Sequence, residues 1–377
     1  MKKIKLQELS DFGQSLWLDY ISRPLLESGK LKELIDIGLR GMTSNPTIFN
    51  QSISLTKDYD EKIVQLHEQG KSTFEIYDDL TIRDVQEAAD FFKPVYEKTK
   101  GLDGYVSLEI NPKLAMNVAE SIQEGKRLFK KTARGNVMIK VPSTHAGFPV
   151  IEELLTSGIP VNVTLIFSLE QYKETIKAFL KGLNRYLESG GNLSKIQSVA
   201  SVFVSRIDTL IDKLLDEKIS QAKEAATKNK LESLKGKAAV ANCKMIFEQF
   251  KTMAGSESFI SLSRNKASVQ RVLWASTGTK NPQYSDLKYV TELISNPTVN
   301  TVPQKTLEAY LDHGELKEGL LGNKNDAQAI INTLGDFGID LNHICATLLK
   351  DGVAAFENSF DELLSSIQTK VSRLCAK

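Results

Sequence analysis

The sequence predicts an α/β protein whose strands close into one (β/α)8 TIM barrel. Short apolar segments alternate with longer amphipathic ones, and an alternation of strand and helix is typical of a parallel sheet. Eight strand candidates can be counted, which is the number that closes a barrel of this class. The candidates are 15–20, 37–44, 104–110, 136–142, 159–167, 196–204, 270–276 and 298–303.

The segments between the strand candidates have helical spacing. The clearest are 111–131 and 168–189, where apolar residues recur every three or four positions. The connection from about 205 to 269, between the sixth and seventh strands, is longer, and its stretch 220–237 is charged and rich in small residues. We interpret this connection as a solvated helical insertion, because no Pro-, Gly- or Ser-rich spacer marks a domain boundary there.

After the eighth strand the pattern predicts further helices at about 304–377. Two stretches carry the pattern, KTLEAYLDHG and DGVAAFENSFDELLSSIQTKVSRLCAK. We expect these helices to wrap the barrel or to cover part of its mouth. A chain of 377 residues could form two domains by length alone, but barrels of this kind often exceed the usual domain size. We therefore predict a single domain, 1–377.

The composition excludes several classes of partner. The formal net charge is +1 with 25% charged residues, so the chain lacks the excess of one sign that nucleic-acid binding requires. No stretch approaches the roughly 20 apolar residues of a membrane span. The three cysteines are widely spaced and form no CxxC pair, which argues against a disulfide framework and a zinc site. With no apolar segment of a signal peptide near the N-terminus, we expect a cytoplasmic protein that binds neither nucleic acid nor membrane.

Lys140 is the most unexpected residue in the strand candidates, because NVMIKVPST (136–144) is otherwise almost wholly apolar. Successive strand residues point to opposite faces, so Val137, Ile139 and Val141 share one face and Lys140 lies on the other. In a barrel the aliphatic face packs under the helices and the other face points to the centre. The pattern therefore directs the Lys140 side chain inward.

The same rule directs two carboxylates and two further polar groups inward. Asp19, Glu109 and Lys140 come from three different strands and should meet near the C-terminal ends, where barrel enzymes carry out their chemistry. Asn162 and Thr164 join them from a fourth strand. An unpaired charge in such a place costs several kcal/mol, so we expect these groups to lie close together.

One lysine and two carboxylates suit imine chemistry with a ketone. Burial disfavours the charged form of a lysine, and a neutral amine attacks carbonyl carbon. The carboxylates can move the protons that imine formation and cleavage of the neighbouring carbon–carbon bond require. No GxGxxG, GxxxxGK[ST], HExxH or GxSxG motif is found, so we expect no cofactor and no metal. The alternative is a structural Lys140, paired with Glu109 or Asp19, or exposed on a misplaced strand.

Several motifs resemble those of the transaldolase family, in the same order along the whole barrel. They are LWLDYISRPLLESGKL (16–31), TSNPTIF (43–49), NVMIKVPST (136–144), GIPVNVTLIFS (158–168) and SVFVSRID (201–208). WASTGTKNPQYSD (274–286), the following TVNTVP and the C-terminal helices resemble the longer bacterial type of transaldolase. They are unlike the short fructose-6-phosphate aldolase branch of the same superfamily.

The resemblance implies a role for each inward-facing group. Lys140 matches the lysine that forms the Schiff base, and Asp19 the aspartate that takes the proton from the C4 hydroxyl. Glu109 would act through a water held by Thr164 to make and break the carbinolamine. Three residues match positions that bind the dihydroxyacetone hydroxyls: Asn45, Asn162 and Ser201.

The resemblance is less complete at the phosphate end. Arg206 of FVSR matches the arginine that binds phosphate, and its guanidinium suits phosphate geometry. Ser276 of WASTGTK matches a serine that contacts phosphate. Shorter members carry an arginine two residues after that serine, where this chain has Gly278. Lys280 is the nearest cation and our candidate for the second phosphate contact.

As a whole the resemblance implies a transferase of carbohydrate metabolism, a transaldolase of the non-oxidative pentose phosphate pathway. It would transfer dihydroxyacetone from sedoheptulose 7-phosphate to glyceraldehyde 3-phosphate, giving erythrose 4-phosphate and fructose 6-phosphate. Its partners would be small-molecule sugar phosphates, and it would be a monomer or homodimer. Two alternatives stay open: an aldolase that releases dihydroxyacetone to water, and a sugar-phosphate-binding barrel that has lost catalysis.

Overall fold

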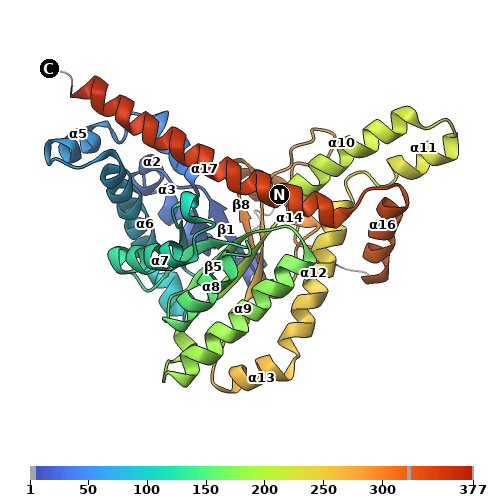
Figure 1. Ribbon diagram of the computed structural model, residues 1–377, viewed down its shortest axis with the longest axis horizontal. Coiled ribbons are helices and arrows are strands. Elements are labelled where there is room, and N and C mark those ends of the chain that lie inside the picture. The colour runs from blue at the N-terminus through green and yellow to red at the C-terminus, as the bar shows by residue number, and fades with distance from the viewer. Residues whose placement is uncertain (1–5, 321–323, 376–377) are drawn as a thin grey trace.

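The computed structural model describes residues 6–320 and 324–375. In this part of the chain, parallel strands pair in sequence order and close into a barrel, with β1 pairing to β8 (Figure 1). The predicted (β/α)8 TIM barrel is therefore confirmed. The strands are β1 (Gln14–Asp19), β2 (Gly41–Thr43), β3 (Tyr105–Glu109), β4 (Val137–Pro142), β5 (Val161–Ile166), β6 (Ser198–Phe203), β7 (Arg271–Ala275) and β8 (Thr298–Val302).

Each strand lies inside its predicted segment except β1, which starts one residue earlier, and only β2 is much shorter than expected. The apolar segment 37–44 predicted one long strand, but Ile37 caps the preceding helix and only Gly41–Thr43 is paired. Gly38 lies between the two at a φ of 119°, and a Cβ there would come within 2.3 Å of the Gln7 backbone nitrogen. The first half of the apolar segment is thus a tight helix-to-strand turn.

Helices surround the barrel in the connections between strands. Up to β6 they are α1 (Leu6–Phe12), α2 (Arg23–Glu27), α3 (Lys30–Asp36), α4 (Pro46–Ser54), α5 (Asp60–Glu68), α6 (Thr73–Lys98), the 3-10 turn η1 (Pro112–Leu114), α7 (Val118–Thr132), α8 (Gly147–Thr156), α9 (Leu169–Glu188) and the 3-10 turn η2 (Leu193–Lys195). The predicted helix 168–189 is α9, which Ser168 and Gln171 start with a capping box. The predicted helix 111–131 begins later, because Asn117 caps α7.

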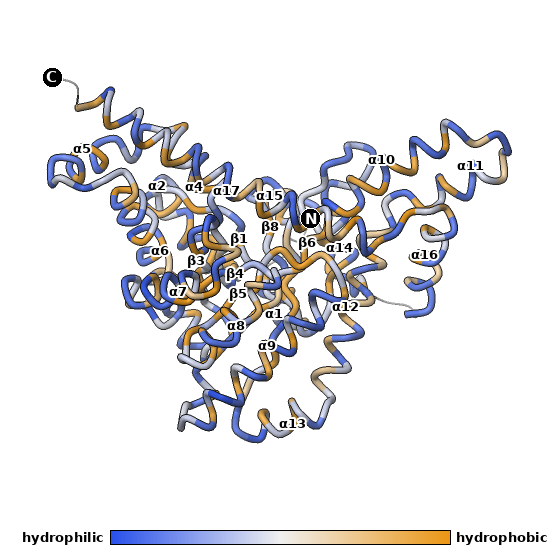
Figure 2. The backbone as a smooth tube through the Cα atoms, viewed as in Figure 1, coloured by the Kyte–Doolittle hydropathy of each residue, from blue (hydrophilic) through white to orange (hydrophobic). Residues whose placement is uncertain are grey.

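The long connection between β6 and β7 is helical, as predicted. It contains α10 (Ser205–Gln221), α11 (Ala225–Glu232), α12 (Ala238–Ala254) and α13 (Glu257–Arg264). The outer ends of α10 and α11 project from the barrel, and hydrophilic residues dominate there (Figure 2). This agrees with the solvated character expected of 220–237. Between β7 and β8 lies the short α14 (Lys288–Thr291).

The C-terminal part of the described chain is also helical, as predicted, with α15 (Gln304–His313), α16 (Lys324–Asp336) and α17 (Leu341–Leu374). Helix α17 runs across the molecule from α16 to α5 (Figure 1). On its way Ser359 meets Thr47 of α4 at 2.9 Å, and the ring of Phe360 meets Tyr77 of α6 edge-on at 5.1 Å. Helix α17 therefore covers part of the barrel mouth.

Polar side chains meet in the barrel interior, as the strand alternation predicts. The Asn162 amide donates to Ser107 Oγ at 3.0 Å, although β5 and β3 are separated by β4. Thr43 and Thr301 meet at 2.7 Å, although β2 and β8 are separated by β1. Contacts between strands that do not pair can only cross the interior. The polar faces therefore point to the centre and the aliphatic faces to the helices.

Candidate active site

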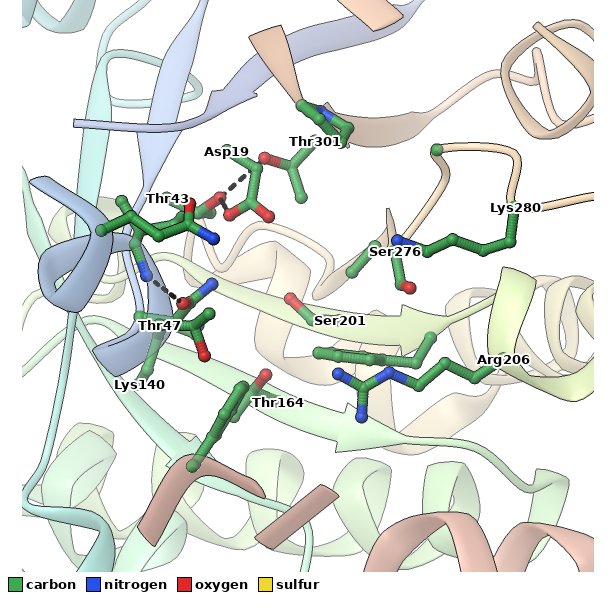
Figure 3. Close-up of a pocket in the computed structure, with 18 residues that line it drawn as sticks. Asp19, Thr43, Thr47, Lys140, Thr164, Ser201, Arg206, Ser276, Lys280 and Thr301 are labelled. Carbon is green, nitrogen blue, oxygen red and sulfur yellow. Dashed lines mark hydrogen bonds between the residues drawn. The ribbon is translucent and has the colours of Figure 1, made fainter. Parts of the chain in front are cut away.

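A cavity of about 280 Å³ opens at the C-terminal ends of the strands, under α17 (Figure 3). Eight residues proposed from the sequence line it: Asp19, Asn45, Lys140, Thr164, Ser201, Arg206, Ser276 and Lys280. Two others, Glu109 and Asn162, are buried beside it but do not line it. The fold thus gathers residues from five strands and the loops that follow them around one cavity.

Lys140 reaches this cavity from β4 with only 4% of its surface exposed. Its Nζ lies 3.1 Å from Glu109 Oε2 and donates to the Ser44 carbonyl at 3.0 Å. The ring of Phe356, from α17, lies with its centre 5.8 Å from the same nitrogen. The amine is thus held at the cavity wall by one carboxylate, one carbonyl and one aromatic face.

Glu109 ends β3 directly beside Lys140, its paired neighbour on β4. Burial raises the pKa of Glu109, and the charge of Lys140 opposes this rise. Its side chain lines a second, much smaller cavity of about 10 Å³, which Phe356 also lines. A carboxyl with a raised pKa keeps its proton to a higher pH than an exposed glutamate and can exchange it with a group beside it.

Thr164 faces the main cavity from β5. Its Oγ1 is buried and has no hydrogen-bond partner among the described residues. Leaving a buried hydroxyl unsatisfied typically costs about 1–3 kcal/mol, so such groups usually have a partner when the site works. This supports the expected role of Thr164 in holding a water, which stays a prediction.

Asp19 occupies the end of β1 on the same side of the cavity as Thr43 and Thr301 (Figure 3). Thr43 Oγ1 donates to Asp19 Oδ1 at 2.6 Å and meets Thr301 at 2.7 Å. Burial raises the pKa of Asp19, while Lys140 and the Thr43 hydrogen bond lower it. The carboxylate is therefore held in one orientation and is a stronger base than an exposed aspartate.

The three residues expected to bind hydroxyl groups differ in their surroundings. Asn45 caps α4 by accepting from the Ile48 N–H at 2.9 Å, and its side chain lines the cavity. Ser201 lines the cavity and donates to Asn162 Oδ1 at 2.6 Å. Asn162 is fully buried beneath Ser201. In this structure Asn162 orients Ser201, and a direct contact of Asn162 with substrate stays a prediction.

The candidate phosphate ligands lie together on the opposite side of the cavity from Lys140 (Figure 3). Arg206 follows the first residue of α10, and burial lowers its pKa. Ser276 follows β7 with a φ of 54° and lies 3.1 Å from Ser205 Oγ. Lys280 is exposed in the same loop, and Gly278 lines the cavity between them. The cavity thus has Arg206 and Lys280 at one end and Lys140 at the other.

Other lining residues were missed by the sequence reasoning. Thr43 and Thr301 lie in the quoted motifs TSNPTIF and TVNTVP, and the alternation rule could have found them. Phe203 lies in SVFVSRID and stacks against Arg206, with 5.5 Å from the guanidinium carbon to the ring centre. Phe356 had no such signal, because nothing local in α17 tells which of its turns crosses the cavity.

None of the helices within residues 6–320 and 324–375 is long and apolar enough to cross a membrane. No cluster of three or more His, Cys, Asp or Glu side chains that could hold a metal ion occurs among these residues.

Known proteins resemble this chain over nearly its full length. The family model described as Transaldolase/Fructose-6-phosphate aldolase matches residues 16–367. A transaldolase from Trichodesmium erythraeum is 42% identical over 372 residues, covering 98% of each chain. A transaldolase from Saccharopolyspora erythraea is 42% identical over 370 residues, again 98% of each chain. One from Mycobacterium tuberculosis is 44% identical over 362 residues, 95% of each chain.

Proposed function

Because the chain belongs to the transaldolase/fructose-6-phosphate aldolase family, we propose that Lys140 is the nucleophile of a transaldolase reaction. The enzyme transfers a dihydroxyacetone unit from sedoheptulose 7-phosphate to glyceraldehyde 3-phosphate, giving erythrose 4-phosphate and fructose 6-phosphate. The observation that carries the residue assignment is the buried Lys140 amine, 3.1 Å from the Glu109 carboxylate, in a cavity whose far end holds Arg206 and Lys280.

Imine formation begins when the neutral Lys140 amine attacks the ketone carbon of the donor sugar. The carbonyl π bond breaks, and the oxygen becomes the hydroxyl of a carbinolamine. Glu109 then gives a proton, through a water held by Thr164, to this hydroxyl, which leaves as water. The positive iminium that results is an electron sink beside the bond to be cleaved. The neighbouring Glu109 carboxylate, ionised after giving up its proton, stabilises that charge.

Cleavage requires a base at the next hydroxyl along the sugar. Asp19 takes the proton from the C4 hydroxyl, the C3–C4 bond breaks, and its electrons neutralise the iminium to form an enamine. The aldehyde product leaves, and the acceptor aldehyde takes its place. The enamine carbon attacks the acceptor, Asp19 returns the proton, and hydrolysis of the new imine frees Lys140.

The remaining lining residues orient the sugar between these two ends. Asn45 and Ser201, with Asn162 behind Ser201, would bind hydroxyls of the dihydroxyacetone unit. Arg206, Ser276 and Lys280 would bind the phosphate, since guanidinium and ammonium groups both attract phosphate oxygens. The distance between the phosphate-binding residues and the Lys140 amine then determines which carbon of the sugar lies beside that amine.

Reduction with borohydride tests the nucleophile and the reaction class together. Incubating the protein with fructose 6-phosphate and borohydride should add a stable mass to one peptide, the one that contains Lys140. Lys140→Ala should abolish this adduct, because no imine forms, whereas Lys177→Ala removes an exposed lysine of α9 and should keep it. An adduct that survives in Lys140→Ala would sink the assignment.

Product analysis separates transfer from release. With glyceraldehyde 3-phosphate present, the enamine should be captured and little free dihydroxyacetone should form. An aldolase would release dihydroxyacetone at the same rate with or without the acceptor. A barrel that only binds sugar phosphates would give neither product nor adduct.

We propose further that the enzyme works in the cytoplasm as a monomer or homodimer. Its phosphorylated substrates and its buried free thiols, Cys243 and Cys345, support a reducing compartment. Cell fractionation and light scattering of the purified protein measure the two properties directly.

A further inference from the structure

The two candidate phosphate cations belong to separate parts of the chain. Arg206 is the second residue of α10, whereas Lys280 lies in the segment that follows β7, residues 276–291, called here the post-β7 segment. Neither side chain forms an ion pair or hydrogen bond with the described residues. Binding one phosphate with both cations therefore requires that the backbones of α10 and the post-β7 segment be held in a fixed relation.

Two carboxylates on α10 make that connection. Asp208 and Asp212 lie one helical turn apart and share a face of the helix. Asp208 Oδ2 accepts from the Tyr289 hydroxyl at 2.9 Å, and Asp212 Oδ2 accepts from the Tyr284 hydroxyl at 2.7 Å. Both tyrosines belong to the post-β7 segment. Both carboxylates are buried, and the bond between Asp208 and Tyr289 is buried with them.

The second oxygen of each carboxylate is bound by the start of α12. Asp208 Oδ1 accepts from the Ala239 N–H at 2.7 Å, and Asp212 Oδ1 accepts from the Gly236 N–H at 2.9 Å. Carboxylates at a helix N-terminus are stabilised by the exposed N–H groups and the helix dipole. The helical insertion between β6 and β7 thus orients both carboxylates toward the tyrosines.

At Gly236 the insertion packs so closely against the post-β7 segment that only glycine fits. Gly236 has a φ of 68°, and a Cβ there would lie 2.8 Å from the ring of Tyr284. Lys288 Nζ lies 5.4 Å from the Tyr284 ring centre and 5.6 Å from that of Tyr289. The Tyr284 ring therefore packs against both the insertion and a cation.

The post-β7 segment transmits this restraint to Lys280. Thr279 Oγ1 donates to the Ser285 carbonyl at 2.8 Å, which closes the loop around Lys280 next to Tyr284. At the start of the loop, the Ser205 N–H donates to the Ser276 carbonyl at 3.0 Å. The loop is thus attached to α10 at its beginning by Ser205 and at its end by the carboxylates.

We infer that Asp208 and Asp212 are positioning residues for phosphate recognition, which hold the Lys280 loop against the helix that carries Arg206. The helical insertion serves this function by binding the second oxygen of each carboxylate. This inference rests on the proposed function only in that the phosphate belongs to the sugar substrates. Neither carboxylate lines the cavity, so both act through the tyrosines and the loop.

The double variant Tyr284→Phe with Tyr289→Phe removes both hydroxyls and keeps both rings. We expect KM for fructose 6-phosphate to rise about tenfold, the loss typical of a hydrogen bond to a charged group, with kcat little changed. With unphosphorylated fructose and glyceraldehyde, kcat/KM should stay within about twofold of the wild type. Tyr172→Phe is the matched control, because Tyr172 is fully buried and its hydroxyl has no partner among the described residues.

Titration calorimetry with inorganic phosphate gives a readout that does not depend on catalysis. The dissociation constant should rise about tenfold in the double variant and in Asp212→Asn, which keeps the side-chain shape if the double variant fails to fold. Equal losses with phosphorylated and unphosphorylated sugars, or unchanged phosphate binding, would overturn the inference. Failure of the proposed function would appear instead as a missing borohydride adduct on the wild-type protein.

Discussion

Lys140 and Glu109 form a buried ion pair that is difficult to explain by stability. Both side chains are about 95% buried, at 5% and 6% exposure, and removing two charges from water costs several kcal/mol for each ion. Replacing such pairs with apolar residues is often neutral or stabilising. Stability alone therefore does not explain the pair, although the Ser44 carbonyl and the Phe356 ring compensate part of its cost.

Asp19→Ala should separate imine formation from cleavage. Lys140 and Glu109 remain, so fructose 6-phosphate should still give the reducible adduct. Without the base at C4, turnover should fall by a factor of about 10²–10⁴, the usual contribution of a positioned acid–base group. Rapid-quench measurement of the adduct and of released aldehyde checks both steps. Loss of the adduct itself would show that Asp19 and Glu109 exchange roles.

Asp208 makes stability depend on pH in a defined direction. Burial is the largest cause of a rise in the Asp208 pKa to about 6, and the negative charge of Asp212 raises it as well. The hydrogen bonds from Ala239 and Tyr289 and the positive charge of Lys288 lower the pKa and offset part of this rise. Because the folded pKa exceeds the unfolded value of about 3.9, the folded state binds the proton more tightly. The stability from this group is thus complete below pH of about 4 and is lost as pH rises through about 6.

Asp208→Asn removes this titration. The unfolding free energy of the wild type minus that of the variant should fall by about 2 kcal/mol between pH 4 and pH 7. Denaturant unfolding at a series of pH values measures the difference, in which the contributions of groups that do not interact with Asp208 cancel. A difference that is constant or that increases with pH contradicts this assignment.

Secondary structure followed largely from local patterns. Short apolar segments located the strands, and helical spacing located helices such as α9. The error at 37–44 arose because apolar residues of a helix end and of a short strand are contiguous, and Gly38 alone signals the turn. The alternation of side chains between the two faces of a strand also predicted that four groups point inward. They are Asp19, Glu109, Lys140 and Thr164, which the structure places in or beside one cavity.

What could not be predicted depends on contacts between distant elements. Phe356 reaches Lys140 because α17 crosses the barrel mouth, and no local pattern specifies that crossing. The link from Asp208 to Tyr289 likewise joins residues 81 positions apart. The charged stretch 220–237 was rightly read as exposed, but Gly236 at its end packs on Tyr284, which composition alone does not reveal.

Gly352 sets the approach of α17 to the barrel. A Cβ there would lie 3.0 Å from Leu165 Cδ2 and 3.6 Å from Arg206. Gly352→Val should push the helix away from the rim and withdraw Phe356, one turn later, from Lys140. We expect a loss of about 1–3 kcal/mol in stability, as for other overpacked sites, and at least about tenfold in kcat/KM.

Gly335→Val in α16 is the control for the cost of the residue change itself. No atom lies within 4 Å of a Cβ at Gly335, so stability should change by less than about 0.5 kcal/mol. Thermal unfolding and steady-state kinetics of both variants provide the comparison. If both variants had the same stability and the same kcat/KM, the close approach of α17 at Gly352 would be shown to matter for neither.

The whole molecule should unfold as one unit, which tests the prediction of a single domain. Helix α17 contacts α4, α5 and α6 from the first half of the chain and α10 from the insertion. We expect one calorimetric transition whose van't Hoff and calorimetric enthalpies agree. Fluorescence of Trp17 and Trp274, both on barrel strands, should change at the same temperature as the helical circular dichroism. Two separate transitions would divide the chain into domains.

Because α17 makes contacts along its whole course across the molecule, few changes in its length can be accommodated. Its buried stripe joins Gly352 at the rim, Phe356 over Lys140, Phe360 against Tyr77, and Lys370, which pairs with Asp60. One inserted or deleted residue rotates everything beyond it by about 100° and shifts it by about 1.5 Å. Insertions and deletions between Gly352 and Lys370 should therefore be eliminated by selection.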